Sequence, residues 1–204
     1  MPSRNVNKID KPESYYHVYA RGSSKQPIFL ESADYHHFIS LFARYLSIKP
    51  QTSKERTVYP HYRGQIELLA YCLMKNHFHM LLYQVEKGSM SLLMKSIMTS
   101  YGRYFNLKYK RTGSLYESTY KASLIDAGNY LLHISRYIHL NPRYWQRYKY
   151  SSISYYISGA EVEWLQKERV AALFASPQQY RMFLKDYEEH KAILDELKYE
   201  LADV

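Results

Sequence analysis

The chain has 204 residues, enough for one domain with a substantial core and a short appended segment. It carries 28 Lys and Arg against 19 Asp and Glu, a formal net charge of +9, and this excess suits a polyanionic partner such as nucleic acid. No run of about 18 apolar residues occurs and the first residues lack a signal peptide's apolar stretch, so we expect a cytoplasmic protein with no membrane partner.

The first part of the chain predicts a polar arm, a strand and a helix. Residues 1–14 are polar with two prolines, and we expect a flexible arm there. Residues 15–20 are aromatic and β-branched, which is typical of a strand. Ser32 can cap the next helix, whose apolar residues recur at helical spacing and which should end before Pro50. Residues 49–64 form a polar connection.

Two strands should form the centre of a sheet. Residues 66–74 are nearly all apolar, as expected for a strand covered on both faces. A two-residue turn can then lead into a strand that begins at His77. On that strand His77 and His79 project from one face, while the apolar residues between and after them pack on the other. Such a pair can hold a divalent metal, although paired histidines also occur as ordinary surface or hydrogen-bonded residues.

The second half of the chain predicts a helix, a strand and a further helix. Residues 90–108 carry apolar residues at helical spacing, and Gly113 then marks a basic turn. Residues 115–125 predict a strand, and Asp126 is a candidate cap for the later helix, which should end near Pro142. This order predicts an α+β fold, a ferredoxin-like antiparallel sheet with helices packed on one face, followed by C-terminal helices.

The later helix carries a row of polar side chains beside its apolar stripe. At about 100° per residue, His133, Tyr137 and Asn141 lie along the edge of the core-facing aliphatic residues, so we expect Tyr137 to be semi-exposed. Each residue also has an ordinary explanation. Tyr137 can be a boundary tyrosine, Asn141 a helix-terminal amide, and His133 a structural residue rather than an auxiliary proton carrier or phosphate contact.

Two of these motifs together resemble the single-tyrosine (Y1) HUH transposases of the IS200 type, most closely the REP-associated tyrosine transposases. They are Asn-His-Phe-His at 76–79 on a strand and Tyr-Ile-His-Leu-Asn-Pro at 137–142 at the end of a helix. The resemblance covers most of residues 12–158, including Arg-Thr-Gly-Ser-Leu-Tyr at 111–116 and Tyr-Ser-Ser at 150–152. Two departures are visible: Lys75 stands where relatives often have proline, and nothing from about residue 160 onward matches.

The resemblance implies a metal-dependent DNA transposase and endonuclease with the ferredoxin-like fold of HUH endonucleases. It implies that His77 and His79 bind Mg²⁺ or Mn²⁺, that Tyr137 is the nucleophile, and that Asn141 stands at the position of a third metal ligand. The product would be a 5′-phosphotyrosine with a free 3′-hydroxyl, and the substrate single-stranded DNA near an imperfect, REP-like hairpin. The chain then divides into an arm (1–14), a Y1-transposase-like catalytic domain (15–158) and a helical C-terminal extension (159–204).

Basic residues interleaved with tyrosines suggest where DNA would bind. The chain has 24 tyrosines, and stacking of bases on aromatic rings with cations on phosphates is a common way to hold single strands. The segment 103–111 precedes the strand that leads to the Tyr137 helix, so we expect it to border the same surface. The alternative is a solvated charged face. We assign DNA contacts to Lys95, Arg103, Lys108, Lys110, Arg111, Lys121 and Arg136.

Three other functions compete with this assignment. The first is a catalytically silent or regulatory hairpin-DNA-binding protein derived from a transposase, which would need neither the histidines nor Tyr137. The second is a zinc or other metal-dependent hydrolase, although no HExxH or CxxC pair occurs. The third is a relaxase or replication initiator, which uses the same chemistry. A transposase of this kind would work in the bacterial cytosol at the nucleoid, and a homodimer is compatible with the sequence.

Overall fold

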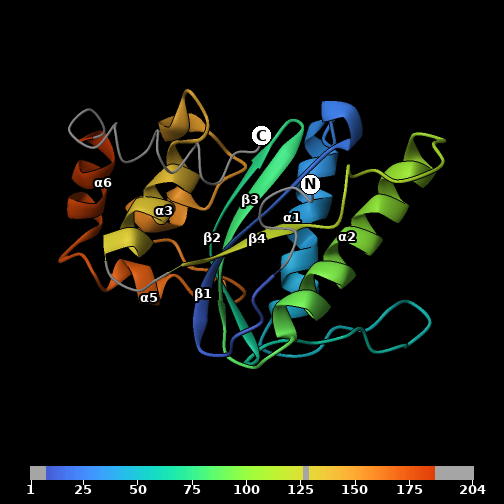
Figure 1. Ribbon diagram of the computed structural model, residues 1–204, viewed down its shortest axis with the longest axis horizontal. Coiled ribbons are helices and arrows are strands. Elements are labelled where there is room, and N and C mark those ends of the chain that lie inside the picture. Colours follow the sequence, from blue (N-terminus) through green and yellow to red (C-terminus); the bar gives the residue numbers. More distant parts are fainter. Residues whose placement is uncertain (1–7, 126–128, 187–204) are drawn as a thin grey trace.

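An antiparallel four-stranded sheet forms the centre of the computed structural model, which describes residues 8–125 and 129–186 (Figure 1). Its strands are β1 (Ser14–Arg21), β2 (Ile66–Met74), β3 (His77–Gln84) and β4 (Lys121–Ile125). They lie in the order β2-β3-β1-β4, and each neighbouring pair is antiparallel. A β-α-β-β-α-β chain produces this order in the ferredoxin-like fold, so the predicted fold class is confirmed.

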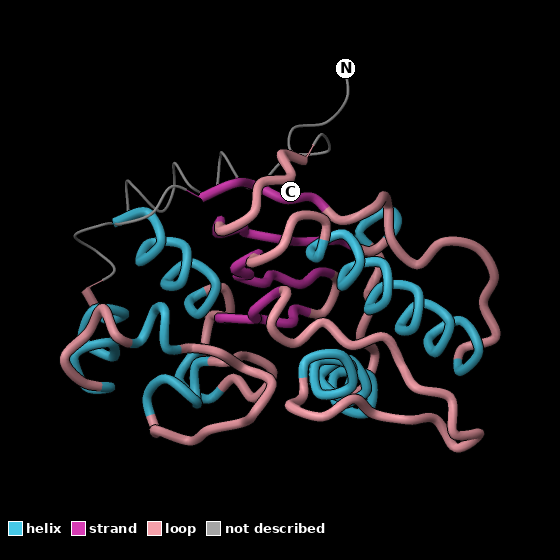
Figure 2. The backbone as a smooth tube through the Cα atoms, turned by 90° about the horizontal axis from the view of Figure 1, so that it is seen from below, coloured by secondary structure: helices cyan, strands magenta, loops and turns pink. Residues whose placement is uncertain are grey.

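Helices cover both faces of the sheet (Figure 2). α1 (Ser32–Leu46) and α2 (Ser89–Lys108) pack on one face, as predicted. α3 (Asn129–Leu140), which carries Tyr137, packs on the opposite face against β2 and β3. The C-terminal helices α4 (Ile153–Ile157), α5 (Glu168–Ala171) and α6 (Pro177–Lys185) join α3 there. Two short 3-10 helices complete the described elements, η1 (Ser23–Lys25) and η2 (Trp145–Arg147).

Because side chains alternate along β3, this strand contributes residues to two hydrophobic cores, one on each face of the sheet. Phe78, Met80 and Leu82 are buried in the core under α1 and α2. Leu81 belongs to the second core, under α3. Because successive strand residues point to opposite faces, His77 and His79 lie on the α3 side of the sheet.

Two predicted details differ from the observed structure, and a third lies outside the described residues. The strand predicted at 115–125 is limited to β4, because the chain before it turns around the end of β1, where the Glu117 amide donates to the Arg21 carbonyl at 3.1 Å. Ser32 is the first residue of α1, and the cap is instead at Glu31, whose amide donates to the Asp34 carboxylate at 3.1 Å. The predicted cap at Asp126 lies outside the described residues.

The described part of the segment after residue 158 packs on the domain. The Gln166 amide donates to the Leu68 carbonyl of β2 at 2.8 Å, and Val170, Tyr180 and Leu184 are buried in the core with α3. Residues 8–13 of the predicted arm are also held in place, because Asp10 accepts hydrogen bonds from β3 and from the start of α2. Within the described ranges, no helix is long and apolar enough to cross a membrane.

Candidate active site

The centre of the α3 side of the sheet is built from alternate residues of β1 and β3. Tyr19 lies directly opposite His79 in the strand register, and Arg21 lies opposite His77. The rings of His77 and His79 are 5.0 Å apart and nearly perpendicular. The predicted common face of the two histidines is thus confirmed, and β1 adds a cation and an aromatic ring that the sequence analysis did not assign to it.

Tyr137 lies over these histidines. Its ring centre is 5.3 Å from that of His79 and 5.9 Å from that of His17, in both cases edge to face. The prediction of a semi-exposed side chain is wrong, because Tyr137 is only 6% exposed. The reason is that α3 packs directly on the sheet, so the edge of its apolar stripe is covered by the β1 and β3 side chains.

Asn141 joins the tyrosine to the histidine pair. It follows the last residue of α3, and its side chain is near enough to Tyr137 and His77 to influence the pKa of each. Burial raises the pKa of Tyr137 to about 12, against the neighbouring Asn141 amide and the Arg21 charge, which both lower it. Four residues predicted from separate parts of the chain, His77, His79, Tyr137 and Asn141, therefore meet in one place.

The two strand histidines are neutral. Burial, together with the charge of Arg21, lowers the pKa of His77 to about 4, and burial lowers the pKa of His79 well below its ordinary value. The Nδ1 atom of His79 is hydrogen-bonded to His17 at 2.9 Å. Its Nε2 atom is buried and has no hydrogen-bond partner among the described residues. Neutral imidazoles with a free nitrogen are the form in which histidine binds metals.

A small cavity of about 10 Å³ lies beside the histidines, about the space of one water molecule. Its walls include His77, His79, Arg21, Glu117 and Lys121. Within the described ranges, no three His, Cys, Asp or Glu side chains are grouped so as to hold a metal. An amide such as that of Asn141 would have to complete the ligand set, and oxygen with nitrogen ligands suits Mg²⁺ or Mn²⁺.

Three residues at this site were missed by the sequence analysis: His17, Arg21 and Glu117. His17 is completely buried and bonded to His79. A signal existed, since His17 lies in the strand predicted at 15–20 and Arg21, four positions later, would share its face if that strand were one residue longer. The sequence could not show that this strand and the one that begins at His77 are neighbours, and Glu117 lay within a segment predicted as strand.

The predicted DNA-contact residues fall into separate places. Lys121 is buried in the wall of the histidine cavity, with its ammonium 6.0 Å from the Tyr19 ring centre. Arg136 is completely buried against α6, where it donates to the Phe183 carbonyl and lies 4.2 Å from the Phe183 ring centre. Arg136 therefore has a packing role in this structure, and a surface contact with DNA is not compatible with its position.

His133 contacts Arg136 on the same helix. Its Nδ1 atom lies 2.8 Å from a guanidinium nitrogen of Arg136, and its ring faces Phe183. These contacts support the structural role weighed for His133.

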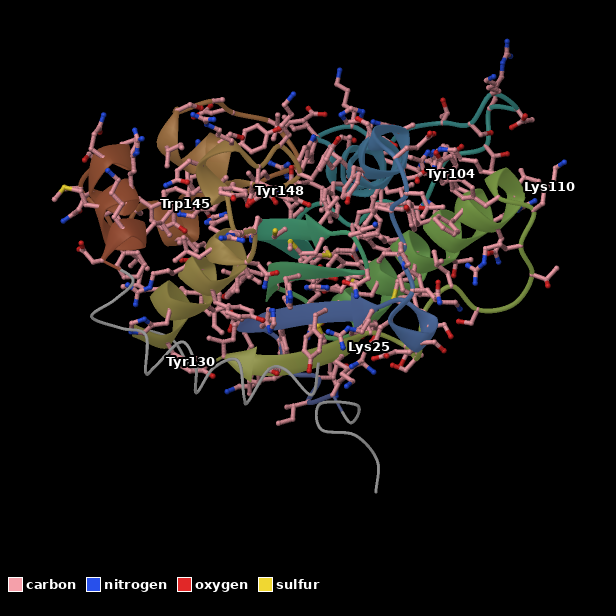
Figure 3. The ribbon with its side chains drawn as sticks, turned by 90° about the horizontal axis from the view of Figure 1, so that it is seen from above. Lys25, Tyr104, Lys110, Tyr130, Trp145 and Tyr148 are labelled. Carbon is pink, nitrogen blue, oxygen red and sulfur yellow. The ribbon has the colours of Figure 1, made fainter. Side chains whose placement is uncertain are left out.

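The basic segment 103–111, which begins on α2, lies on the far side of the sheet from α3. The expectation that this segment borders the Tyr137 surface is therefore wrong for most of its residues. Lys108 forms ion pairs with Glu31 and the buried Asp34, both at 2.6 Å, which gives it a role in holding α1 to α2. Lys110 lies at the outer end of α2, and Arg111 follows it (Figure 3). Lys95 and Arg103 instead line a groove beside α2.

Comparison with known proteins agrees with this geometry. The family model of IS200-like transposases matches residues 57–141, a range that contains both β3 histidines, Tyr137 and Asn141. A solved structure of a REP-associated tyrosine transposase bound to a REP hairpin is similar in fold, with a TM-score of 0.54 and 13% sequence identity over 76% of this chain and 86% of that chain. No curated protein matches the sequence significantly. The family-model match supports the resemblance to the IS200-like, single-tyrosine (Y1) transposases that the motifs indicate, and the solved structure supports the fold that this resemblance implies.

Proposed function

We propose that this protein is a transposase that cleaves single-stranded DNA by forming a covalent bond to Tyr137 and then joins the strand to a different end. The observation that carries the proposal is the meeting of Tyr137, His79, His77 and Asn141 at one buried site beside a small cavity. A protein that only binds DNA needs no such arrangement of a phenol with neutral imidazoles.

In the cleavage step, the Tyr137 oxygen attacks the phosphorus of a phosphodiester. A phosphotyrosine forms, the bond from phosphorus to O3′ of the neighbouring nucleotide breaks, and O3′ takes up a proton to leave as a hydroxyl. In the joining step, a 3′-hydroxyl of another strand attacks the phosphotyrosine, and the phenol is restored with its proton. Because the covalent link keeps the phosphodiester energy, strand transfer needs no ATP.

The site must activate a weak nucleophile, because the raised pKa of Tyr137 leaves little phenolate at neutral pH. The positive charge of Arg21 lowers that pKa, and Arg21 and Lys121 line the wall of the histidine cavity, where their charges would attract an approaching phosphate. His77, His79 and Asn141 would hold Mg²⁺ or Mn²⁺. When bound, such an ion polarises a non-bridging phosphate oxygen and neutralises developing charge.

The substrate that we propose is unpaired DNA beside an imperfect hairpin, with the 5′-phosphate attached to Tyr137. The similar structure is described as bound to a REP hairpin, and the formal net charge of +9 suits a nucleic-acid partner. Both points support the proposal through likeness and charge rather than through a contact in this chain.

The test is formation of a covalent adduct. Purified protein is incubated with labelled single-stranded DNA hairpins from the regions that flank its own gene, with Mg²⁺ or Mn²⁺, and analysed on a denaturing gel. We expect a shifted band with the wild-type protein and none with Tyr137→Phe, whose fold and DNA binding should be kept. Tyr130→Phe and Tyr144→Phe serve as controls that retain the band.

Two outcomes would count against the proposal. A band that persists in Tyr137→Phe would show that another residue is the nucleophile. Tight binding of the hairpins by the wild-type protein without any adduct would favour the catalytically silent hairpin-binding protein.

A further inference from the structure

An open groove of about 550 Å³ lies between α2 and residues 113–120, which lead into β4. One hydrogen bond joins the two walls at each end. The hydroxyl groups of Ser91 and Tyr120 are 2.9 Å apart, and the Asn106 amide nitrogen donates to the Gly113 carbonyl at 2.8 Å. The groove is thus formed by the fold itself, as binding grooves for ligands commonly are.

The groove adjoins the active site. Ser118 and Thr119 line the groove and also line the small cavity that contains His77 and His79. The chain between α2 and β4 therefore connects the two faces of the sheet at its β4 end. A strand of DNA lying in the groove would therefore pass close to the histidine cavity.

The groove has the chemistry of a site for unpaired nucleic acid. Lys95 and Arg103 lie along one wall, and neither forms an ion pair with a carboxylate within the described ranges, in contrast to Lys108 on the same helix. Tyr116, in the other wall, is 6% exposed, and its hydroxyl has no hydrogen-bond partner among the described residues. Cations commonly hold the phosphates of single strands, and protein polar groups form hydrogen bonds to the edges of unpaired bases, which the Tyr116 hydroxyl is able to do.

Gly102 gives an independent indication of a ligand. It lies in the interior of α2, where glycine is unfavourable, and it also lines the groove. A Cβ atom added at Gly102 would have no atom within 4 Å, so packing inside the protein does not require glycine there. Close approach of a bound molecule to the helix backbone would account for the glycine.

We propose that this groove holds an unpaired stretch of the DNA strand next to the phosphate that Tyr137 attacks. Lys95 and Arg103 contact its phosphates, and a base enters beside Tyr116. The proposal rests on the proposed function, because it takes DNA as the partner and the histidine site as the place of cleavage.

The test compares variants in binding to a labelled single-stranded poly-dT oligonucleotide and to a duplex of equal length. Lys95→Gln with Arg103→Gln should weaken single-strand binding by about tenfold and lower the slope of log affinity against log salt by about 1.4, or about 0.7 for each contact. The matched control, Lys54→Gln with Arg56→Gln, removes the same charge from the exposed connection between α1 and β2, outside the groove, and should leave the slope unchanged.

A second variant, Gly102→Gln, fills the groove without removing a charge. We expect an equal or higher melting temperature, because glutamine is the better helix former, together with weaker single-strand binding. Each of three results would overturn the proposal. They are equal effects in the two charge variants, single-strand affinity of Gly102→Gln equal to that of the wild-type protein, and a higher affinity of the wild-type protein for the duplex than for the single strand. Adduct formation distinguishes failure of the groove proposal from failure of the proposed function. If the groove variants form the adduct as the wild-type protein does, the result counts against the groove alone. If the wild-type protein forms no adduct although its binding depends on the groove, the result counts against the cleavage chemistry alone.

Discussion

His17 and His79 form a buried pair across β1 and β3, with Nε2 of His17 2.9 Å from Nδ1 of His79 and the two rings stacked at 5.0 Å. Because Nδ1 of His79 is engaged in this bond, its Nε2 atom is the nitrogen left for a ligand. A partner of this kind sets the tautomer and the ring orientation of a metal-binding histidine. His17 is therefore a positioning residue for the proposed metal site.

We predict that His17→Ala lowers the affinity for Mn²⁺ by about 10- to 100-fold, the usual effect of losing the hydrogen-bond partner of a metal ligand. Electron paramagnetic resonance of free Mn²⁺ measures this affinity without any turnover. His17→Gln, which keeps a polar atom beside His79, should restore part of it. The control is His139→Ala, which removes an equally buried histidine away from the site; if both alanine variants lose the same affinity, the effect is one of general destabilisation.

We predict that His77→Ala combined with His79→Ala abolishes cleavage and leaves salt-sensitive DNA binding in place. Phosphate contacts come from lysine and arginine side chains, whose contribution depends on salt, and not from the imidazoles. Adduct gels and fluorescence anisotropy at two salt concentrations measure the two properties separately. His36→Ala with His37→Ala, on α1, should change neither, and cleavage by the β3 double variant would refute a metal role for that pair.

Lys108 should matter for stability and not for DNA. Its ammonium lies 2.6 Å from the Asp34 carboxylate, which is buried and also accepts a hydrogen bond from the Tyr109 hydroxyl at 2.8 Å. Removing the cation leaves this buried carboxylate without its charged partner. We therefore predict that Lys108→Gln lowers the melting temperature by several degrees while single-strand affinity stays at the wild-type level. A loss of affinity with an unchanged melting temperature would return Lys108 to the DNA-binding surface.

His139 should make the protein acid-sensitive. It is completely buried between the Tyr180 hydroxyl at 2.6 Å and the Ser152 hydroxyl at 2.7 Å, and burial lowers its pKa from 6.5 to about 3. Below pH 6.5 the unfolded chain takes up a proton that the folded protein excludes, so stability present above this pH is lost as the pH falls toward 3. At about pH 5 the loss amounts to about 2 kcal/mol.

Denaturant unfolding between about pH 7 and pH 5 measures this dependence. We expect His139→Gln to be less stable at neutral pH and to lose less stability on acidification. His17, whose pKa burial also lowers to about 3, should account for part of what remains. An identical pH dependence in the variant and the wild-type protein would show that His139 does not contribute.

Local patterns were enough to predict much of the fold. The strand predicted at 66–74 is β2, and β3 begins at His77 as predicted, because a continuous apolar run and an alternation of side chains are both local signals in a sequence. His77, His79, Tyr137 and Asn141 were found in the same way, from spacing within single elements together with a family resemblance. These features depend on residues a few positions apart.

Tertiary structure alone decided the surroundings of those residues. The amphipathic pattern of α3 shows which stripe is buried, but not which face of the sheet covers it, so the burial of Tyr137 could not be predicted. His17 bonds a histidine 62 positions later in the chain, through a strand pairing that neither strand encodes alone. Arginine and lysine are typical surface residues, yet Arg136 is buried against Phe183 and Lys108 pairs with the buried Asp34. The sequence by itself determined which residues can do the chemistry, and only long-range packing decided which of them meet, because such contacts leave no period in the sequence.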